Sequence, residues 1–171
     1  MNYLQEFAKK ENAEFNFDGE VITADTSPVK KGKYQLLWSN ETGKYSLSFS
    51  HSEHALSHNN SHYSELILEI SKDSVLNFEY IKVDILEKIF AKIFARKNSQ
   101  LVQGYLLKSN SLKHAKGLLK KIDLTSKDIQ SVSVKSLPQV TSIQIESRDN
   151  FVKNGIADSY VKLLENIAAQ L

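Results

Sequence analysis

The chain has 171 residues and a hydrophobic fraction of 41%, enough to bury the core of one domain or of two small ones. It contains no cysteine, which excludes disulfides, thiolate metal ligands and thiol nucleophiles. The net charge of +2 conceals an asymmetry, because residues 1–83 carry −4 and residues 84–171 carry +6. The first residues lack the apolar segment of a secretory signal, and no run approaches the ~18 apolar residues that cross a bilayer. We therefore expect a cytoplasmic protein that is not transmembrane.

The N-terminal part predicts a helix followed by a hairpin. In residues 3–13, Leu4, Phe7 and Ala8 lie on one side at helical spacing and charged residues lie elsewhere, which indicates a short amphipathic helix. Apolar residues then alternate over 15–17 into Asp18-Gly19, a dipeptide typical of tight hairpin turns, and residues 21–24 would return as the second strand. The segment 28–32 contains proline and glycine and is expected to be a loop.

A second hairpin has the clearest pattern in the chain. Residues 34–38 and 45–49 alternate apolar and polar side chains on either side of a turn at residues 40–43. A four-residue loop fixes which residues face each other across the two strands. The expected pairs are Trp38 with Tyr45, Leu36 with Leu47, and Tyr34 with Phe49. We expect this face of large side chains to be buried in the core.

Two further strands and a helix complete the first half. Residues 66–70 and 76–80 alternate around a turn at 71–74, which extends the hairpins into an antiparallel meander. Residues 84–97 follow with a wide apolar stripe, an acidic start at Asp84 and a basic end, as in a helix that covers a sheet.

The second half alternates strands and helices. Residues 101–107 predict a strand, and residues 112–122 predict a helix that follows a serine- and asparagine-rich cap. Two short strands are expected around Pro138, and residues 152–167 predict a long terminal helix. The expected order of this half is therefore β-α-β-β-α.

These elements predict an α+β fold, in which an antiparallel β-meander sheet is packed by helices. No linker rich in glycine, proline or serine divides the chain, so we expect one domain over residues 1–171. The alternative is a division into two subdomains near residues 84–100.

Four of the five histidines lie within twelve residues, at His51, His54, His58 and His62. On a helix their spacing would place all four imidazoles on one face, where they could hold zinc or a similar ion. The nearby Asn59-Asn60-Ser61 run disfavours a helix, and His51 continues the alternation of the preceding strand. A strand end and a polar loop are the favoured interpretation, and a metal site is the alternative.

The most unusual charge feature is the segment from Lys88 to Lys121, which holds nine Lys or Arg residues and no carboxylate. If the expected helices bring these charges together, they would attract phosphate or other anionic groups. The candidate anion-binding residues are Lys88, Lys92, Arg96, Lys113, Lys116 and Lys120. Only two arginines occur in the chain, so sequence-specific DNA binding is not expected.

Catalytic spacings are missing from the sequence. It has no glycine-rich phosphate loop, no glycine-framed nucleophile and no HExxH pattern, and no cofactor is expected. We therefore expect a non-enzymatic intracellular binding or protein-interaction module, with a protein or a weakly held anion as its partner. The alternative function is a metal-binding protein or metal-dependent enzyme that uses the histidine cluster.

Overall fold

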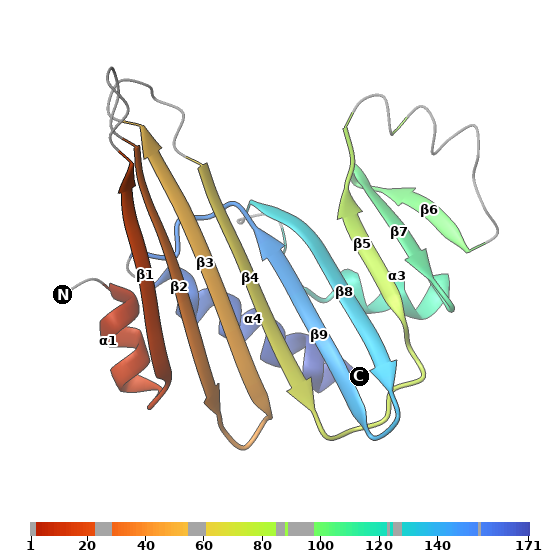
Figure 1. Ribbon diagram of the computed structural model, residues 1–171. Coiled ribbons are helices and arrows are strands. Elements are labelled where there is room, and N and C mark those ends of the chain that lie inside the picture. The colour runs from red at the N-terminus through yellow and green to blue at the C-terminus, as the bar shows by residue number, and fades with distance from the viewer. Residues whose placement is uncertain are drawn as a thin grey trace.

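The computed structural model describes residues 3–22, 29–54, 61–84, 88, 98–122, 124, 128–153 and 155–171, without the side chains of 20–22, 29–30 and 53–54. Within these residues, nine strands form one antiparallel sheet in the order β1-β2-β3-β4-β9-β8-β5-β7-β6. The described helices all lie on one face of this sheet, and no described helix or strand covers the other face, which we call the open face (Figure 1). The elements are α1 Tyr3–Lys10, β1 Glu14–Ile22, β2 Val29–Ser39, β3 Lys44–His54, β4 Ser61–Ile70, β5 Phe78–Lys82, β6 Ser99–Val102, β7 Tyr105–Ser109, α3 Leu112–Leu119, β8 Ile129–Leu137, β9 Val140–Ser147 and α4 Ile156–Gln170.

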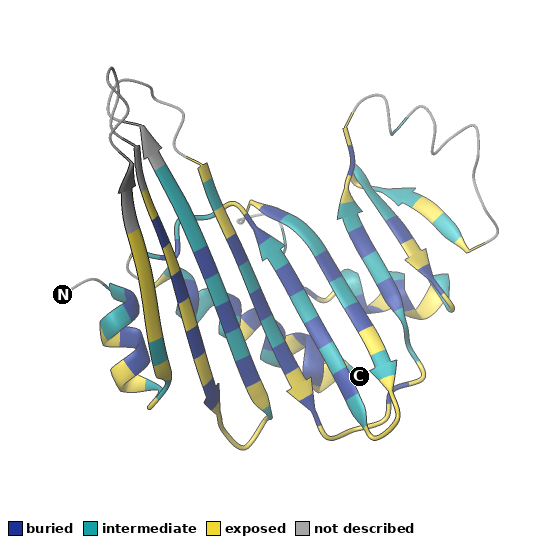
Figure 2. Ribbon diagram, in the orientation of Figure 1, coloured by how far each residue is buried: buried dark blue, intermediate teal, exposed yellow. Residues whose placement is uncertain are grey.

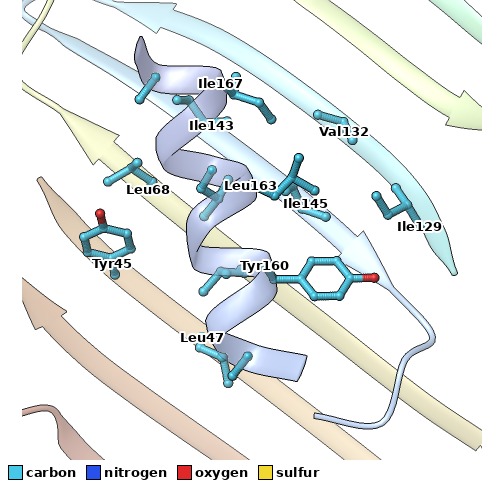
Figure 3. Close-up of a cluster of buried hydrophobic side chains, with 14 of the residues drawn as sticks. Tyr45, Leu47, Leu68, Ile129, Val132, Ile143, Ile145, Tyr160, Leu163 and Ile167 are labelled. Carbon is cyan, nitrogen blue, oxygen red and sulfur yellow. The ribbon is translucent and has the colours of Figure 1, made fainter. Parts of the chain in front are cut away.

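The core lies between the sheet and its helices. Buried residues alternate with half-buried or exposed ones along the central strands, as expected for a sheet that is covered on one face only (Figure 2). Helix α4 packs on β4 and β9, with Tyr160, Leu163 and Ile167 against the sheet (Figure 3). The expected α+β class is confirmed in this coarse sense.

Two predictions for the first half are confirmed. Helix α1 buries Leu4, Phe7 and Ala8, the three side chains expected on its inner side. Strands β2 and β3 pair in the expected register and bury all six large side chains of the hairpin. The turn is held by the Asn40 side chain, whose Oδ1 accepts a hydrogen bond from the Thr42 N–H at 2.8 Å.

The expected hairpin at Asp18-Gly19 is wrong. Strand β1 runs straight through both residues and pairs with β2, so the expected loop at 28–32 is also wrong from Val29 onward. Gly19 faces Gly32 across the two strands, and a Cβ atom on Gly19 would lie 2.4 Å from the Phe17 ring. Glycine at this position therefore leaves room for the Phe17 ring within a strand and does not form a turn.

The expected meander extends only over β1 to β4. The neighbour of β4 is β9, and β5 lies between β8 and β7. Leu66 and Leu68 of β4 therefore face Ile145 and Ile143 of β9, residues about half the chain length away. Strand β5 begins at Phe78, so Leu76 precedes it.

The second half contains one strand more than expected at residues 101–107. Here β6 and β7 form a tight hairpin, with Gln103 and Gly104 both at positive φ (49° and 85°). From Ser99 the described order is β6-β7-α3-β8-β9-α4, and α4 begins at Ile156, after Val152.

The helix expected at 84–97 lies outside the described residues, except at its first residue and at Lys88. The Lys88 N–H donates to the Asp84 carbonyl at 3.0 Å. Among the described residues, no helix has the length and apolar character to cross a membrane. The division into one domain or two subdomains stays a prediction.

Candidate functional site

A pocket of about 470 Å³ lies at the β6 edge of the sheet, between β6 and α3, and we name it the β6–α3 pocket. Strands β6 and β7 end the sheet, and α3 packs on β7 from the helix side (Figure 1). The lining residues that the structure describes are Tyr80, Gln100, Leu101, Val102, Gln103, Lys116, Leu119, Lys120, Ile122 and Leu124.

Helix α3 contributes one of its sides to this pocket. Ala115 and Leu118 are buried toward the core, and Lys116, Leu119 and Lys120 line the pocket. These three residues are neighbours at i, i+3 and i+4 spacing, so they share one side of the helix.

After α3 the chain turns back toward the pocket. The backbone N–H groups that follow the helix hold this turn by donating to carbonyls of α3. The Lys121 N–H donates to the Leu118 carbonyl at 2.9 Å, and the Ile122 N–H donates to that of Leu119 at 3.4 Å. This turn adds the apolar side chains of Ile122 and Leu124 to the wall.

Two stacked tyrosines lie at the sheet side of the pocket. The rings of Tyr80 and Tyr105 are parallel within 10° at a centroid distance of 4.4 Å. The Tyr80 hydroxyl donates to the Val102 carbonyl at 3.3 Å, and that of Tyr105 donates to the Ile129 carbonyl at 3.0 Å. Burial raises the pKa of both hydroxyls above the ordinary value of 10.

The charge at the pocket is positive. Lys116 and Lys120 are the charged members of the lining, and none of the described lining residues is a carboxylate. The Lys116 ammonium donates to the Gln100 side-chain oxygen. Gln100 stands opposite the buried Leu107 on β7, so its side chain lies on the helix face of the sheet. The lysine is therefore held at the pocket by a neutral amide.

The structure divides the expected anion-binding lysines. Lys113 does not line the β6–α3 pocket but lies with Lys121 along a separate groove between α3 and the end of α4. Lys88 lies by the β6–β7 turn, where a Cβ atom on Gly104 would be 3.7 Å from the Lys88 amine. Lys92 and Arg96 lie outside the described residues, so convergence of all six charges stays a prediction.

Two of the four candidate metal ligands are neighbours. His51 of β3 faces His62 of β4 across the sheet, at the strand ends that the sequence favoured. The His51 ring stacks with Tyr34 and with Phe49, each at 5.9 Å, and the His62 ring lies 6.0 Å from that of Phe49. His58 and the side chain of His54 lie outside what is described, and within the described residues no group of three His, Cys, Asp or Glu could hold a metal. The metal site stays a prediction.

The aromatic stacking of His51 and His62 suggests a test of the metal hypothesis. We expect no zinc binding tighter than about 1 μM, because the rings of His51 and His62 are both packed against the ring of Phe49. Calorimetric titration of zinc into metal-free protein measures this. A tight one-to-one isotherm that His54→Ala and His58→Ala abolish would establish the metal site instead.

Fold and pocket together define a class: an open antiparallel sheet with helices on one face and an amphipathic pocket at one edge. Comparison of the chain with protein-family models, with curated proteins and with solved structures found no match. The pocket itself is therefore the basis of the functional argument.

Proposed function

We propose that this protein is a non-enzymatic binding module that holds an amphipathic anion in the β6–α3 pocket. The observation that carries the proposal is the pairing of an apolar wall with two lysines and no described carboxylate. A ligand with an apolar body and a carboxylate or phosphate head would match both parts.

The apolar wall favours the body of such a ligand. Val102, Leu119, Ile122 and Leu124 surround the pocket beside the Tyr80 ring. Its volume of about 470 Å³ lies in the usual range of small-molecule sites. Each methylene group that leaves water contributes about 0.8 kcal/mol to binding.

The two lysines favour a negatively charged head group. Lys120 is exposed and Lys116 is half-buried, so an incoming anion keeps some contact with water while it pairs with both. The Lys116 ammonium has three N–H donors and gives one to Gln100, which leaves donors for a ligand oxygen. A hydrogen bond to a charged group contributes roughly 1.5–3 kcal/mol.

The test compares three ligands that share one alkyl chain: decanoate, decyl phosphate and decanol. By isothermal calorimetry we expect both anions to bind and decanol to bind at least about tenfold more weakly. Equal binding of decanol would contradict the role of the lysines, and no binding of any of the three would contradict the pocket.

A matched pair of double variants, in α3 and the turn that follows it, locates the site. Lys116→Gln/Lys120→Gln should weaken decanoate binding about 10- to 100-fold, because each substitution removes a charged donor. Lys113→Gln/Lys121→Gln makes the same charge change on the other side of α3 and should leave binding unchanged. Equal loss in both pairs would point to nonspecific attraction to a basic helix.

A further inference from the structure

The sheet has two edges of very different length. Strand β6 at one edge has four residues, and β1 at the other has nine. Strand β1 pairs with β2 in an unbroken register over its whole length (Figure 1). Among the described residues, backbone hydrogen bonds from residues 14–22 go only to β2. Within the part of the chain that the structure describes, one side of this nine-residue strand therefore presents backbone donors and acceptors that pair with no other strand.

Strand β1 has only part of the usual protection of an edge. Natural edge strands are often short or bulged, carry charged residues or proline, or are covered by a helix or loop, all of which hinder another strand from pairing with them. Helix α1 lies beside the first part of β1, and the strand carries carboxylates that disfavour acidic partners (Figure 1). The sequence of β1, Glu-Phe-Asn-Phe-Asp-Gly-Glu-Val-Ile, has neither lysine nor proline, and its pairing with β2 shows no bulge. Its geometry suits the addition of an extended segment.

The two faces of β1 have different chemistry. Phe15 and Phe17 point to the helix face, and Phe17 is 53% exposed although its ring lies 4.6 Å from that of Tyr34. Glu14 and Asp18 are exposed on the open face. Successive side chains of an added strand would point to opposite faces of the sheet. Those on the helix face would meet aromatic rings, and those on the open face would meet carboxylates.

Strand β2 shows which sequence pairs with this pattern. On the open face Lys33 stands opposite Asp18, and on the helix face Tyr34 and Leu36 stand opposite Phe17 and Phe15. Lys31 stands opposite Glu20 in the same way, so two lysines of β2 stand opposite two acidic residues of β1. A strand added to the free edge meets the same alternation from the other side.

We propose that β1 is a docking edge for an extended segment of a partner protein in which lysine or arginine alternates with apolar residues. A second copy of this chain is a poor occupant, because β1 carries three carboxylates and no basic residue, and pairing it with itself would oppose like charges. This site is independent of the β6–α3 pocket, which lies at the opposite end of the strand order.

The test uses a fluorescent peptide as long as β1, with the sequence Lys-Tyr-Lys-Val-Lys-Tyr-Lys-Val-Lys. Fluorescence anisotropy should give a dissociation constant below about 100 μM. Hydrogen exchange of β1 amides should slow in the complex, and that of β6 amides should not. A peptide of the same composition with its lysines grouped should bind at least about tenfold more weakly, because it cannot match the two faces.

Charge exchange keeps the test independent of folding defects. Glu14→Lys/Asp18→Lys should weaken the lysine peptide about tenfold and strengthen a peptide with glutamate at each lysine position. The control Glu41→Lys/Glu69→Lys changes the same charge at exposed positions outside β1 and should alter neither affinity.

Several results would overturn the proposal. These are the absence of binding by the lysine peptide, equal affinity for the grouped peptide, and binding that does not slow hydrogen exchange of the β1 amides. Failure of Glu14→Lys/Asp18→Lys to bind the glutamate peptide is a further such result. Slow exchange of β1 amides in the protein alone, coupled to self-association, would make a second copy the occupant and would also overturn it.

Discussion

Phe49→Ala should lower the free energy of unfolding by about 3–5 kcal/mol, the usual cost of removing a fully buried phenylalanine ring. Phe49 has no exposed surface and sits at the centre of an aromatic row on the helix face. Its ring lies 5.8 Å from that of Tyr34 and 6.2 Å from that of Phe151, so one substitution removes contacts on both sides. Denaturant unfolding at equilibrium measures the loss.

Leu37→Ala provides the control on the same sheet. Leu37 points to the open face and is 48% exposed, so its loss should change the free energy of unfolding by less than about 0.5 kcal/mol. Equal effects of the two substitutions would show that the open face is covered in solution. A loss below about 1 kcal/mol for Phe49→Ala would contradict the packing of the helix face.

The hairpin around Phe49 could be predicted because all of its determinants are local. The turn at Asn40 fixes the loop length, and alternation on both strands then fixes the register, so Trp38 meets Tyr45 and Tyr34 meets Phe49. Helix α1 was predictable for the same reason, since its period reveals its buried side without any knowledge of the partner.

The errors arose where distant partners decide the local structure. Asp18-Gly19 has the composition of a turn, but pairing with Gly32 and covering by the Phe17 ring hold it in a strand. At Gln103-Gly104 a turn was missed. Glutamine is not a typical first residue of a turn with positive φ, so the composition did not predict the turn. The pairing of β4 with β9 joins residues far apart in the sequence, and alternation alone does not identify a strand's neighbour.

The β6–α3 pocket was predictable only in part. Charge patterning singled out Lys116 and Lys120, but it grouped Lys113 with them as a candidate anion-binding residue, and the structure separates Lys113 from the pocket. The apolar wall was missed because Ile122 and Leu124 follow the end of α3 and Val102 belongs to a strand. A signal was present in Leu119, Ile122 and Leu124, which continue apolar spacing past the basic helix.

Tyr160→Phe should have the second large effect on stability, because the Tyr160 hydroxyl connects α4 to the end of β9. The hydroxyl lies 2.6 Å from the Ser147 hydroxyl and donates to Asp149 Oδ2 at 2.6 Å, in a side chain with no exposed surface. Removing it leaves Ser147 and Asp149 each without one partner, at a cost of about 1–3 kcal/mol. The control Tyr63→Phe removes a hydroxyl that donates to Glu146 from a half-exposed side chain, and it should cost less than about 0.5 kcal/mol.

The same substitution should change how stability depends on alkaline pH. Burial, and then the hydrogen bond to Asp149, raise the pKa of Tyr160 above its ordinary value of 10. Above about pH 10 the unfolded chain releases this proton and the folded chain keeps it. The contribution of Tyr160 to the free energy of unfolding is therefore fully present below that pH and is lost as the pH rises. Tyr160→Phe removes one such proton and should reduce the slope by up to about 1.4 kcal/mol per pH unit. Denaturant unfolding from about pH 9 to pH 11 measures both slopes, and identical slopes for wild type and Tyr160→Phe would show that Tyr160 ionises in the folded protein as readily as in the unfolded chain.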